Sequence, residues 1–357
     1  MKKVLELAKK GIGFVNPDPL LGAVAVKENH IIGEGAYMYY GDAYAEMKAL
    51  RNAAGNSVGS ELYVNLDPFL PGRDVEEICR RIILSGIKKV YIGMLSPDME
   101  SSKRGIEALR QQSIEVITGV LEEECSELNE IYSHYINTGL PFVFTKWAMT
   151  LDGKLATVTG DSKWISSEGS LRFVHHLRQR TAAIMVGENT VRLDNPMLTT
   201  RLDNVEISNP IRVILSKYGY ISPEANVLKV DEKTMTIIIA SEKIPKDNED
   251  MLLKKGVELL KFKEYDNRID FKEIARALGK KKIDSLYIEG GSEVLASAFE
   301  SGIVNKVYAA VAPKIVGGRN AITPIGGKGI ERMKDAIMLK KVTHEIVGND
   351  VIFKGYI

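Results

Sequence analysis

The chain has 357 residues, 45% of them hydrophobic, and a formal net charge of +1. This length exceeds one ordinary hydrophobic core and is sufficient for two soluble domains. The near-neutral charge gives no electrostatic basis for binding a nucleic acid or an acidic membrane. Two cysteines, Cys79 and Cys125, do not make a secreted disulfide framework. Because residues 1–11 lack the apolar core of a signal peptide and no run of about 18 apolar residues predicts a membrane span, we expect a cytoplasmic protein.

The first 140 residues alternate short apolar runs with segments of helical periodicity, which predicts an α/β domain with a largely buried sheet. Strands are predicted at residues 23–27, 31–33, 61–66, 89–94 and 114–119. Helices are predicted at residues 43–53, 74–85, 105–112 and 122–137. The turn Thr138-Gly139-Leu140-Pro141 then interrupts the pattern. We therefore predict two domains, at residues 1–140 and 141–357.

The second domain repeats the alternation of strands and helices, so the fold class predicted for the whole chain is α/β. Strands are expected near residues 142–149, 183–186, 211–215, 236–240, 285–289 and 306–311. Helices are expected near residues 167–180, 270–278 and 293–301. No internal repeat and no low-complexity tract complicates this division.

The most informative pattern in the second domain is SLYIEGGSEVLASAFE at residues 285–300. An apolar strand ends at Glu289, and Gly290, Gly291 and Ser292 lead into an amphipathic helix. The two glycines let a ligand approach the backbone, and the free N–H groups of the helix N-terminus favour a phosphate. For an isolated Gly-Gly pair, however, we favour a plain strand-to-helix turn with Ser292 as the N-cap.

Three other polar segments lie beside predicted strands. They are KWAMTLDGK from Lys146, TGDSKWI with Trp164, and GENTVRLDNPML with Thr190 and Asp194. Loops after strand ends often bind ligands in α/β sheets, and an aromatic ring there can stack on a flat ligand. Arg178 and Arg201 are nearby cations that could hold a phosphate. Taken singly, these features are explained as well by turns, a buried tryptophan or solvated charges.

In order and spacing, these segments resemble the reductase domain of the bifunctional deaminase–reductase family of riboflavin biosynthesis. The resemblance extends to a helix ending in HHLRQR, to PIRVIL and to APKIVGG, and it covers essentially the whole second half. It implies a fold similar to that of dihydrofolate reductase. It also implies that NADPH reduces the ribosyl group of 5-amino-6-(5-phosphoribosylamino)uracil to a ribityl group.

Carried over residue by residue, the resemblance implies two sets of binding residues and three catalytic candidates. Residues implied for the NADPH site are Ala148, Trp164, Thr190, Asp194, Gly290, Gly291 and Ser292. Residues implied for the substrate site are Ser162, Arg178, Leu198, Arg201 and Glu289, with the arginines nearest the phosphate. The catalytic candidates are Lys146, Glu289 and Asp194, and the sequence does not choose the proton donor among them. Ser216 and Lys217 follow a strand where the family often has an acidic residue, which bears only on contacts to the adenosine end of the cofactor.

The first half resembles the deaminase domain of the same family, which has a cytidine-deaminase-like fold. The matching segments include NPDPLLGAVAV from Asn16, AYAEMKAL from Ala43 and LYVNLDP from Leu62. Zinc deaminases hold their metal with one histidine and two cysteines, while a glutamate moves protons. The resemblance therefore directs attention to these four positions.

The metal-ligating residue types are missing from the three ligand positions. Tyr44 stands at the histidine position, and Phe69 and Ile78 stand at the two cysteine positions, whereas Glu46 is retained. Phenylalanine and isoleucine cannot ligate a metal, and the five histidines form no predictable three-ligand set with Cys79. We therefore expect no metal site, no zinc and no deamination.

The sequence as a whole predicts a reductase fused to a degenerate deaminase domain, acting on a small phosphoribosylamino-pyrimidine. We expect a homodimer, because reductase domains of the family self-associate, and no nucleic-acid or membrane partner. Two alternatives stay open: a reductase of a related pyrimidine or pteridine nucleotide, and a non-catalytic nucleotide-binding scaffold. In the first domain, Asp18 replaces a pyrimidine-contacting asparagine of the family. We favour a domain kept for folding and oligomerisation over one that binds a pyrimidine-like ligand.

Overall fold

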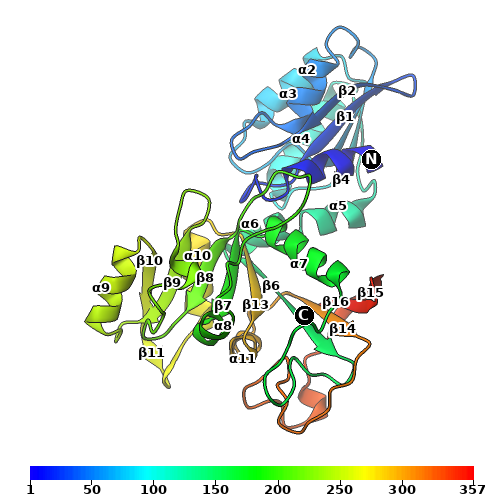
Figure 1. The fold of residues 1–357 in the computed structure, drawn as a ribbon. Coiled ribbons are helices and arrows are strands. Elements are labelled where there is room, and N and C mark those ends of the chain that lie inside the picture. Colours follow the sequence, from blue (N-terminus) through cyan, green and yellow to red (C-terminus); the bar gives the residue numbers. More distant parts are fainter. The chain divides into compact units, whose positions relative to one another are not determined.

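The computed structural model describes residues 1–357 as two compact units, Met1–Gly139 and Leu140–Ile357. Each unit is a mixed α/β structure built around its own sheet (Figure 1). Strands and helices alternate along both units, as the sequence predicts. No helix in either unit is long and apolar enough to cross a membrane.

The first unit contains a five-stranded sheet in the order β2-β1-β3-β4-β5. Strand β1 is antiparallel to β2 and β3, whereas β3, β4 and β5 are parallel. The strands are β1 Gly22–Lys27, β2 His30–Ala36, β3 Glu61–Leu66, β4 Lys89–Met94 and β5 Glu115–Ile117. The helices are α1 Lys2–Ala8, η1 Lys9–Gly11, α2 Ala45–Asn52, α3 Val75–Leu84, α4 Met99–Gln111, α5 Glu122–Leu128 and α6 Glu130–Thr138.

Backbone contacts in the hairpin of β1 and β2 fix the start of helix α2. The hairpin turns at Glu28 and Asn29, whose φ angles of 50° and 64° suit the twist of the two strands. A β-carbon on Gly35 would lie 1.9 Å from the backbone oxygen of Ala45, so only glycine allows β2 to pack this closely against α2. This contact holds Glu46, which lies in the first turn of α2.

One predicted helix in the first unit is wrong. Residues 122–137 do not form a single helix, because α5 and α6 are separated at Asn129. The buried Asn129 side chain accepts a hydrogen bond from the backbone N–H of Leu20 (2.8 Å) and donates one to the Leu20 carbonyl (3.1 Å). These contacts with a distant segment favour a break that the local helical pattern does not indicate.

The second unit contains a nine-stranded sheet in the order β10-β9-β8-β7-β13-β6-β14-β16-β15. Neighbouring strands from β10 to β14 are parallel, and β16 and β15 are added antiparallel at one edge. The strands are β6 Phe142–Thr150, β7 Ala183–Gly187, β8 Ile211–Leu215, β9 Thr236–Ser241, β10 Glu258–Phe262, β13 Ser285–Gly290, β14 Lys306–Ala312, β15 Lys340–Val347 and β16 Asp350–Tyr356, beside a small hairpin of β11 Glu264–Tyr265 and β12 Arg268–Ile269. The helices are α7 Glu168–Arg180, α8 Glu188–Asp194, η2 Asn226–Leu228, α9 Lys246–Lys254, α10 Phe271–Lys280, α11 Ser292–Ser301 and η3 Met333–Asp335.

Several elements of the second unit are not predicted from the sequence. Strands β10, β15 and β16 and helix α9 are among them, and the polar segment after β7 is the short helix α8 rather than a loop. Strand β15 is exposed along nearly its whole length, so it carries no buried face that would produce an apolar period. Its pairing with β16 across the turn at Gly348 defines it as a strand.

Helix α7 is tied at its N-terminus to strand β16. Ser167 is the N-cap of this helix. The buried carboxylate of Asp350 accepts hydrogen bonds from the Ser167 backbone N–H (2.7 Å), the Ser167 hydroxyl (2.9 Å) and the Ser170 hydroxyl (2.6 Å). Because these donors satisfy a buried carboxylate, they fix the position at which α7 begins.

We predict that Asp350→Ala lowers the free energy of unfolding of the second unit by about 1–3 kcal/mol, because buried donors lose their acceptor. Both tryptophans, Trp147 and Trp164, belong to this unit, so tryptophan fluorescence during denaturant unfolding follows it selectively. The matched control is Asp335→Ala, which removes an exposed carboxylate paired with exposed Arg332. An unfolding midpoint for Asp350→Ala equal to that of the control would contradict the prediction.

Candidate active site

Alternate residues of β6 and β13 point to the same face of the second sheet. Phe144 pairs in register with Tyr287, and their rings stack with centroids 5.1 Å apart. Lys146 follows Phe144 by two positions on β6, and Glu289 follows Tyr287 by two positions on β13, so both lie on this face. Both are near the carboxyl ends of these parallel strands. Helix α7 covers this face and reaches Glu289 through Arg178. Ligands of open α/β sheets bind outside the carboxyl ends of the strands, which makes this edge the candidate site.

A cavity of about 250 Å³ is lined by this face of the sheet, helix α7 and the segment 162–166. The residues from α7 follow the i, i+3, i+4, i+7 pattern from Leu171 to Arg178 and therefore share one face of the helix. The lining consists of Lys146, Trp147, Ala148, Ser162, Trp164, Ile165, Ser166, Leu171, Val174, His175, Arg178, Arg201, Tyr287 and Glu289.

Arg178 and Glu289 form a bidentate ion pair in this cavity. Arg178 Nε donates to Glu289 Oε2 at 2.8 Å, and Nη2 donates to Oε1. The remaining Nη1 donates to the carbonyl of Thr199 at 2.8 Å. Burial alone would lower the pKa of Arg178, but the Glu289 carboxylate raises it, so the guanidinium stays charged. The pair therefore joins α7, β13 and the segment after α8 as one charged unit.

Lys146 is a titratable group whose pKa is strongly shifted by its place in the cavity. Its side chain is buried, and this burial lowers its pKa to about 8. Glu289 and Asp350 oppose the effect by raising the pKa, whereas Arg178 lowers it further. An amine with a pKa near 8 is charged at neutral pH, yet it can lose its proton at little cost.

The structure brings together one part of the predicted site in this cavity and places the rest elsewhere. Residues lining the cavity are Lys146, Ala148, Ser162, Trp164, Arg178, Arg201 and Glu289. The predicted residues outside its lining are Thr190, Asp194, Leu198, Gly290, Gly291 and Ser292. Thr190 and Gly291 are neighbours, since a β-carbon on Gly291 would lie 3.5 Å from Thr190 Oγ1. Asp194 is exposed at the end of α8, and Leu198 is buried with a φ of 56°.

Two polar side chains of the cavity were missed by sequence reasoning. The hydroxyl of Tyr287 is fully buried and has no hydrogen-bond partner. His175 Nδ1 accepts a hydrogen bond from the backbone N–H of Arg201 at 3.1 Å, while burial, Arg178 and Arg201 lower the His175 pKa to about 4. Both residues were recoverable from periodicity, because Tyr287 alternates with Glu289 on a strand and His175 precedes Arg178 by three helical positions.

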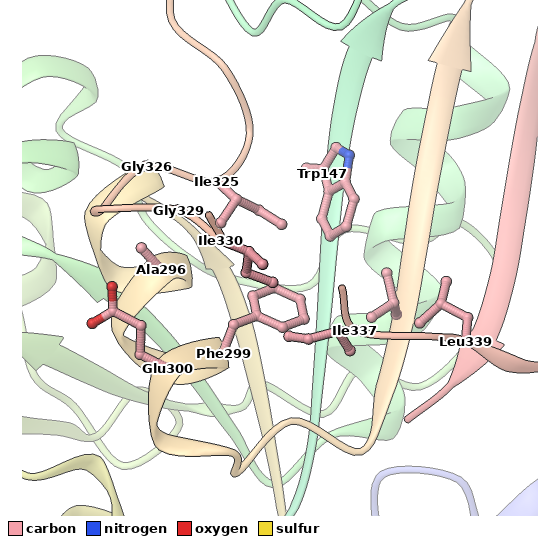
Figure 2. Close-up of a pocket in the computed structure, with 11 residues that line it drawn as sticks. Trp147, Ala296, Phe299, Glu300, Ile325, Gly326, Gly329, Ile330, Ile337 and Leu339 are labelled. Atoms are coloured by element: carbon pink, nitrogen blue, oxygen red, sulfur yellow. The ribbon is translucent and has the colours of Figure 1, made fainter. Parts of the chain in front are cut away.

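A larger cavity of about 490 Å³ is lined by side chains of β6, β14, α11 and the segment 325–339. Figure 2 shows Ile325, Ile330 and Phe299 gathered near Trp147, whose ring meets that of Phe299 edge-on with centroids 6.5 Å apart. Glu300 is its one charged lining residue. This lining is mostly apolar and offers a single titratable side chain, so the smaller polar cavity is the better candidate for chemistry.

The four zinc-deaminase positions of the first unit do not offer a zinc donor set. Phe69 and Ile78 are buried in the hydrophobic cluster of the unit. The neighbouring Cys79 is also buried, which raises the pKa of its thiol to about 11 and disfavours the thiolate that binds zinc. No group of three or more histidine, cysteine or acidic side chains in the chain could hold a metal ion. A zinc ion therefore does not fit the residues present.

We predict that Glu289→Gln lowers the pKa of Lys146 below 8, because it removes a negative charge that stabilises the ammonium form. Lysine-specific ¹³C NMR over a pH titration, with Lys146→Met used to assign the resonance, measures this pKa. Glu293→Gln, on the following helix, is the matched control. A Lys146 pKa that does not move in Glu289→Gln would show that the two groups are not electrostatically coupled.

Comparisons with known proteins identify relatives that span the whole chain and a family model that matches its second unit. The family model of the RibD C-terminal domain matches residues 141–353. The riboflavin biosynthesis protein RibD of Actinobacillus pleuropneumoniae is 39% identical over 99% of this chain and 93% of its own length. RibD of Aquifex aeolicus is 38% identical over 100% of this chain and 98% of its own length.

A solved structure covers both units. A diaminohydroxyphosphoribosylaminopyrimidine deaminase/5-amino-6-(5-phosphoribosylamino)uracil reductase from Thermotoga maritima matches with a TM-score of 0.83 and 35% identity, covering 100% of this chain and 97% of that one. The predicted fold class, with a deaminase-like first domain and a reductase-like second domain, is thereby confirmed. The chain belongs to the RibD family of riboflavin biosynthesis proteins and contains the reductase domain of that family.

Proposed function

We propose that this chain is an NADPH-dependent reductase of 5-amino-6-(5-phosphoribosylamino)uracil and that its deaminase activity is lost. The name of the Thermotoga maritima relative includes this reductase activity. The observation that supports the proposal best is the polar cavity that Lys146 shares with the Arg178–Glu289 pair at the carboxyl edge of the sheet. The reaction produces the ribityl group by adding a hydride to carbon and a proton to nitrogen or oxygen.

The turn between β13 and α11 fits the phosphates of a dinucleotide. A β-carbon on Gly290 would meet no atom within 4 Å, and Gly291 has a φ of 85° that favours glycine. Helix α11 begins at Ser292, so its first N–H groups are available for an anion. With Thr190 beside this turn, the residues would hold the NADPH phosphates, while Ala148 and Trp164 would contact the cofactor in the cavity. Bound there, NADPH would supply a hydride to the imine-like carbon of the ribosyl group.

The adenosine end would lie where the sequence departs from the family. Ser216, at the end of β8, donates a hydrogen bond to the carboxylate of Glu188. The Glu188 carboxylate therefore lies beside Ser216, the position at which the family often has an acidic residue. Lys217 pairs with Glu264 at 2.9 Å, so its positive charge is already neutralised within the chain.

Arg201 is the residue best suited to hold the substrate phosphate. Arg178 directs its donors at Glu289 and Thr199, whereas the side chain of Arg201 is exposed at the cavity. His175 fixes the backbone of Arg201 through its Nδ1 atom. Its exposed guanidinium would bind the phosphate bidentately.

Among the three catalytic candidates, Lys146 is best placed to donate the proton. It lies inside the cavity and carries a proton at neutral pH, because its pKa is about 8. The Glu289 carboxylate accepts two hydrogen bonds from Arg178, and Asp194 is exposed on α8 outside the cavity lining. Glu289 therefore serves to orient Arg178 and to hold a negative charge near Lys146.

We predict that Lys146→Met reduces kcat by about a hundredfold to ten-thousandfold, because a positioned general acid contributes on that order. In the unaltered enzyme, kcat falls as pH rises through about 8, since Lys146 loses its proton there. Turnover is measured by NADPH oxidation with the ribosylaminouracil phosphate, and circular dichroism checks the fold. Lys334→Met, an exposed lysine of the same unit, is the control. Full activity in Lys146→Met would remove this residue from the mechanism.

We also predict that the purified protein contains no stoichiometric zinc and releases no ammonia from the aminated pyrimidine substrate. The reason is that Tyr44, Phe69 and Ile78 supply no metal ligand of the deaminase set. Elemental analysis after incubation with zinc and desalting, together with an ammonia assay, makes the measurement. About one zinc per chain accompanied by ammonia release would contradict the proposed loss of deaminase activity.

A further inference from the structure

The cavity that contains Lys146 adjoins a second cavity beside helix α7. This adjoining cavity has a volume of about 380 Å³. Leu171, His175 and Arg201 line both cavities, so the two spaces meet at a shared wall. The rest of the adjoining lining comes from the beginning of α7 and from the segment after Arg201, and consists of Glu168, Gly169, Arg172, Leu202 and Asp203. One ligand can therefore extend from the first cavity into the second.

The cavity around Lys146 is too small to hold both reactants of the proposed reaction. Its volume is about 250 Å³, whereas pockets for drug-sized ligands typically have about 300–1,000 Å³. The proposed substrate is of that size, because it joins a pyrimidine, a ribosyl group and a phosphate. The nicotinamide ring must enter the same cavity for hydride transfer. Part of the substrate must therefore lie in the adjoining cavity.

Two guanidinium groups line the adjoining cavity without ion pairs. Arg172 and Arg201 are both exposed, and neither forms a salt bridge within the chain. Glu168 lies four positions before Arg172 on α7, a spacing that often gives an ion pair, yet these two side chains do not pair. Arg178, in contrast, directs its donors at Glu289 and Thr199. The donors of Arg172 and Arg201 are thus available to an anionic ligand.

The wall between the two cavities lies in a positive field. Burial is the largest cause that lowers the pKa of His175 to about 4, and Arg178 and Arg201 lower it further, although Glu289 opposes them. Burial and then Arg172 lower the pKa of the neighbouring His176. The charges of three arginines therefore act on this part of α7. Such a field favours a bound anion over a neutral group.

We propose that the substrate phosphate binds in the adjoining cavity and that Arg172 is its second cation, beside Arg201. This inference rests on the proposed reductase function and deepens it by adding a residue to the substrate site. The ribosyl group would extend from there toward Lys146. Two carboxylates, Glu168 and Asp203, also line this cavity. A carboxylate repels a phosphate but accepts hydrogen bonds from a pyrimidine N–H, so the effect of removing one distinguishes the two occupants.

Steady-state kinetics with the substrate and with its dephosphorylated form test the role of Arg172. We expect Arg172→Gln to raise the KM for the phosphorylated substrate about tenfold, because a charge-assisted hydrogen bond is lost, and to leave the KM for the dephosphorylated form within about twofold. NADPH oxidation measures both. Arg276→Gln, which removes an exposed arginine of α10, is the matched control. Equal changes in KM for the two compounds, or no change for either, would overturn the proposal.

Asp203→Asn provides a test of opposite sign. If the phosphate occupies the adjoining cavity, removing this carboxylate should lower the KM for the phosphorylated substrate by about twofold, because an exposed repulsive charge is gone. If the pyrimidine occupies it instead, the same variant should raise the KM for both the phosphorylated and the dephosphorylated compound. That second result would overturn the assignment of the phosphate.

Binding of ribose 5-phosphate separates this proposal from the proposed function, because it requires no turnover. Titration calorimetry should show a Kd that is about tenfold higher in Arg172→Gln than in the unaltered chain. Equal Kd values would overturn the role of Arg172. Weaker binding in the variant, together with no NADPH oxidation by the unaltered chain, would support the phosphate site and contradict only the proposed function.

Discussion

The bidentate pair of Arg178 with Glu289 is the interaction on which the reductase site depends. It joins helix α7 to strand β13, and through Thr199 it also fixes the segment after α8. Without it, the cavity that contains Lys146 would have two uncompensated charges in its wall, which is a strongly destabilising arrangement. The pair also sets the field at Lys146, because Glu289 raises and Arg178 lowers the pKa of that amine. The same ion pair therefore holds the cavity wall together and influences the pKa of Lys146.

The two units use the same arginine–carboxylate chemistry in different surroundings. In the second unit, Arg178 and Glu289 lie in the wall of a cavity of about 250 Å³ that also contains polar groups without internal partners, such as the Tyr287 hydroxyl. In the first unit, Arg73 and Glu46 are largely buried, and Arg73 also contacts the Tyr44 ring and the carbonyl of Pro68. One pair lies in the wall of a cavity, whereas the other is enclosed within its unit.

The sequence predicts strands best where burial alone defines them. The continuous apolar runs of β7 and β9 are buried on both faces, so they are found without knowledge of their partners. Strand β15 is defined only by its pairing with β16, and the break at Asn129 depends on contacts with Leu20, more than a hundred positions away. Local patterns do not contain such information.

The same distinction applies to the site. Lys146 and Glu289 stand out from motifs, but their meeting depends on the register of β6 against β13. His175 could have been found from its spacing to Arg178, whereas the partner of Glu46 could not, because Arg73 lies 27 positions away in a turn. Motif reasoning directed attention to Tyr44, Phe69 and Ile78 in the first unit. Only the structure shows that Arg73 pairs with Glu46.

The most direct test of the account compares NADPH oxidation with two substrates, the already deaminated ribosylaminouracil phosphate and its aminated precursor. A reductase whose first domain has lost deaminase chemistry must oxidise NADPH with the deaminated compound alone. Oxidation with the aminated precursor, accompanied by ammonia release, or oxidation with neither compound would contradict the account.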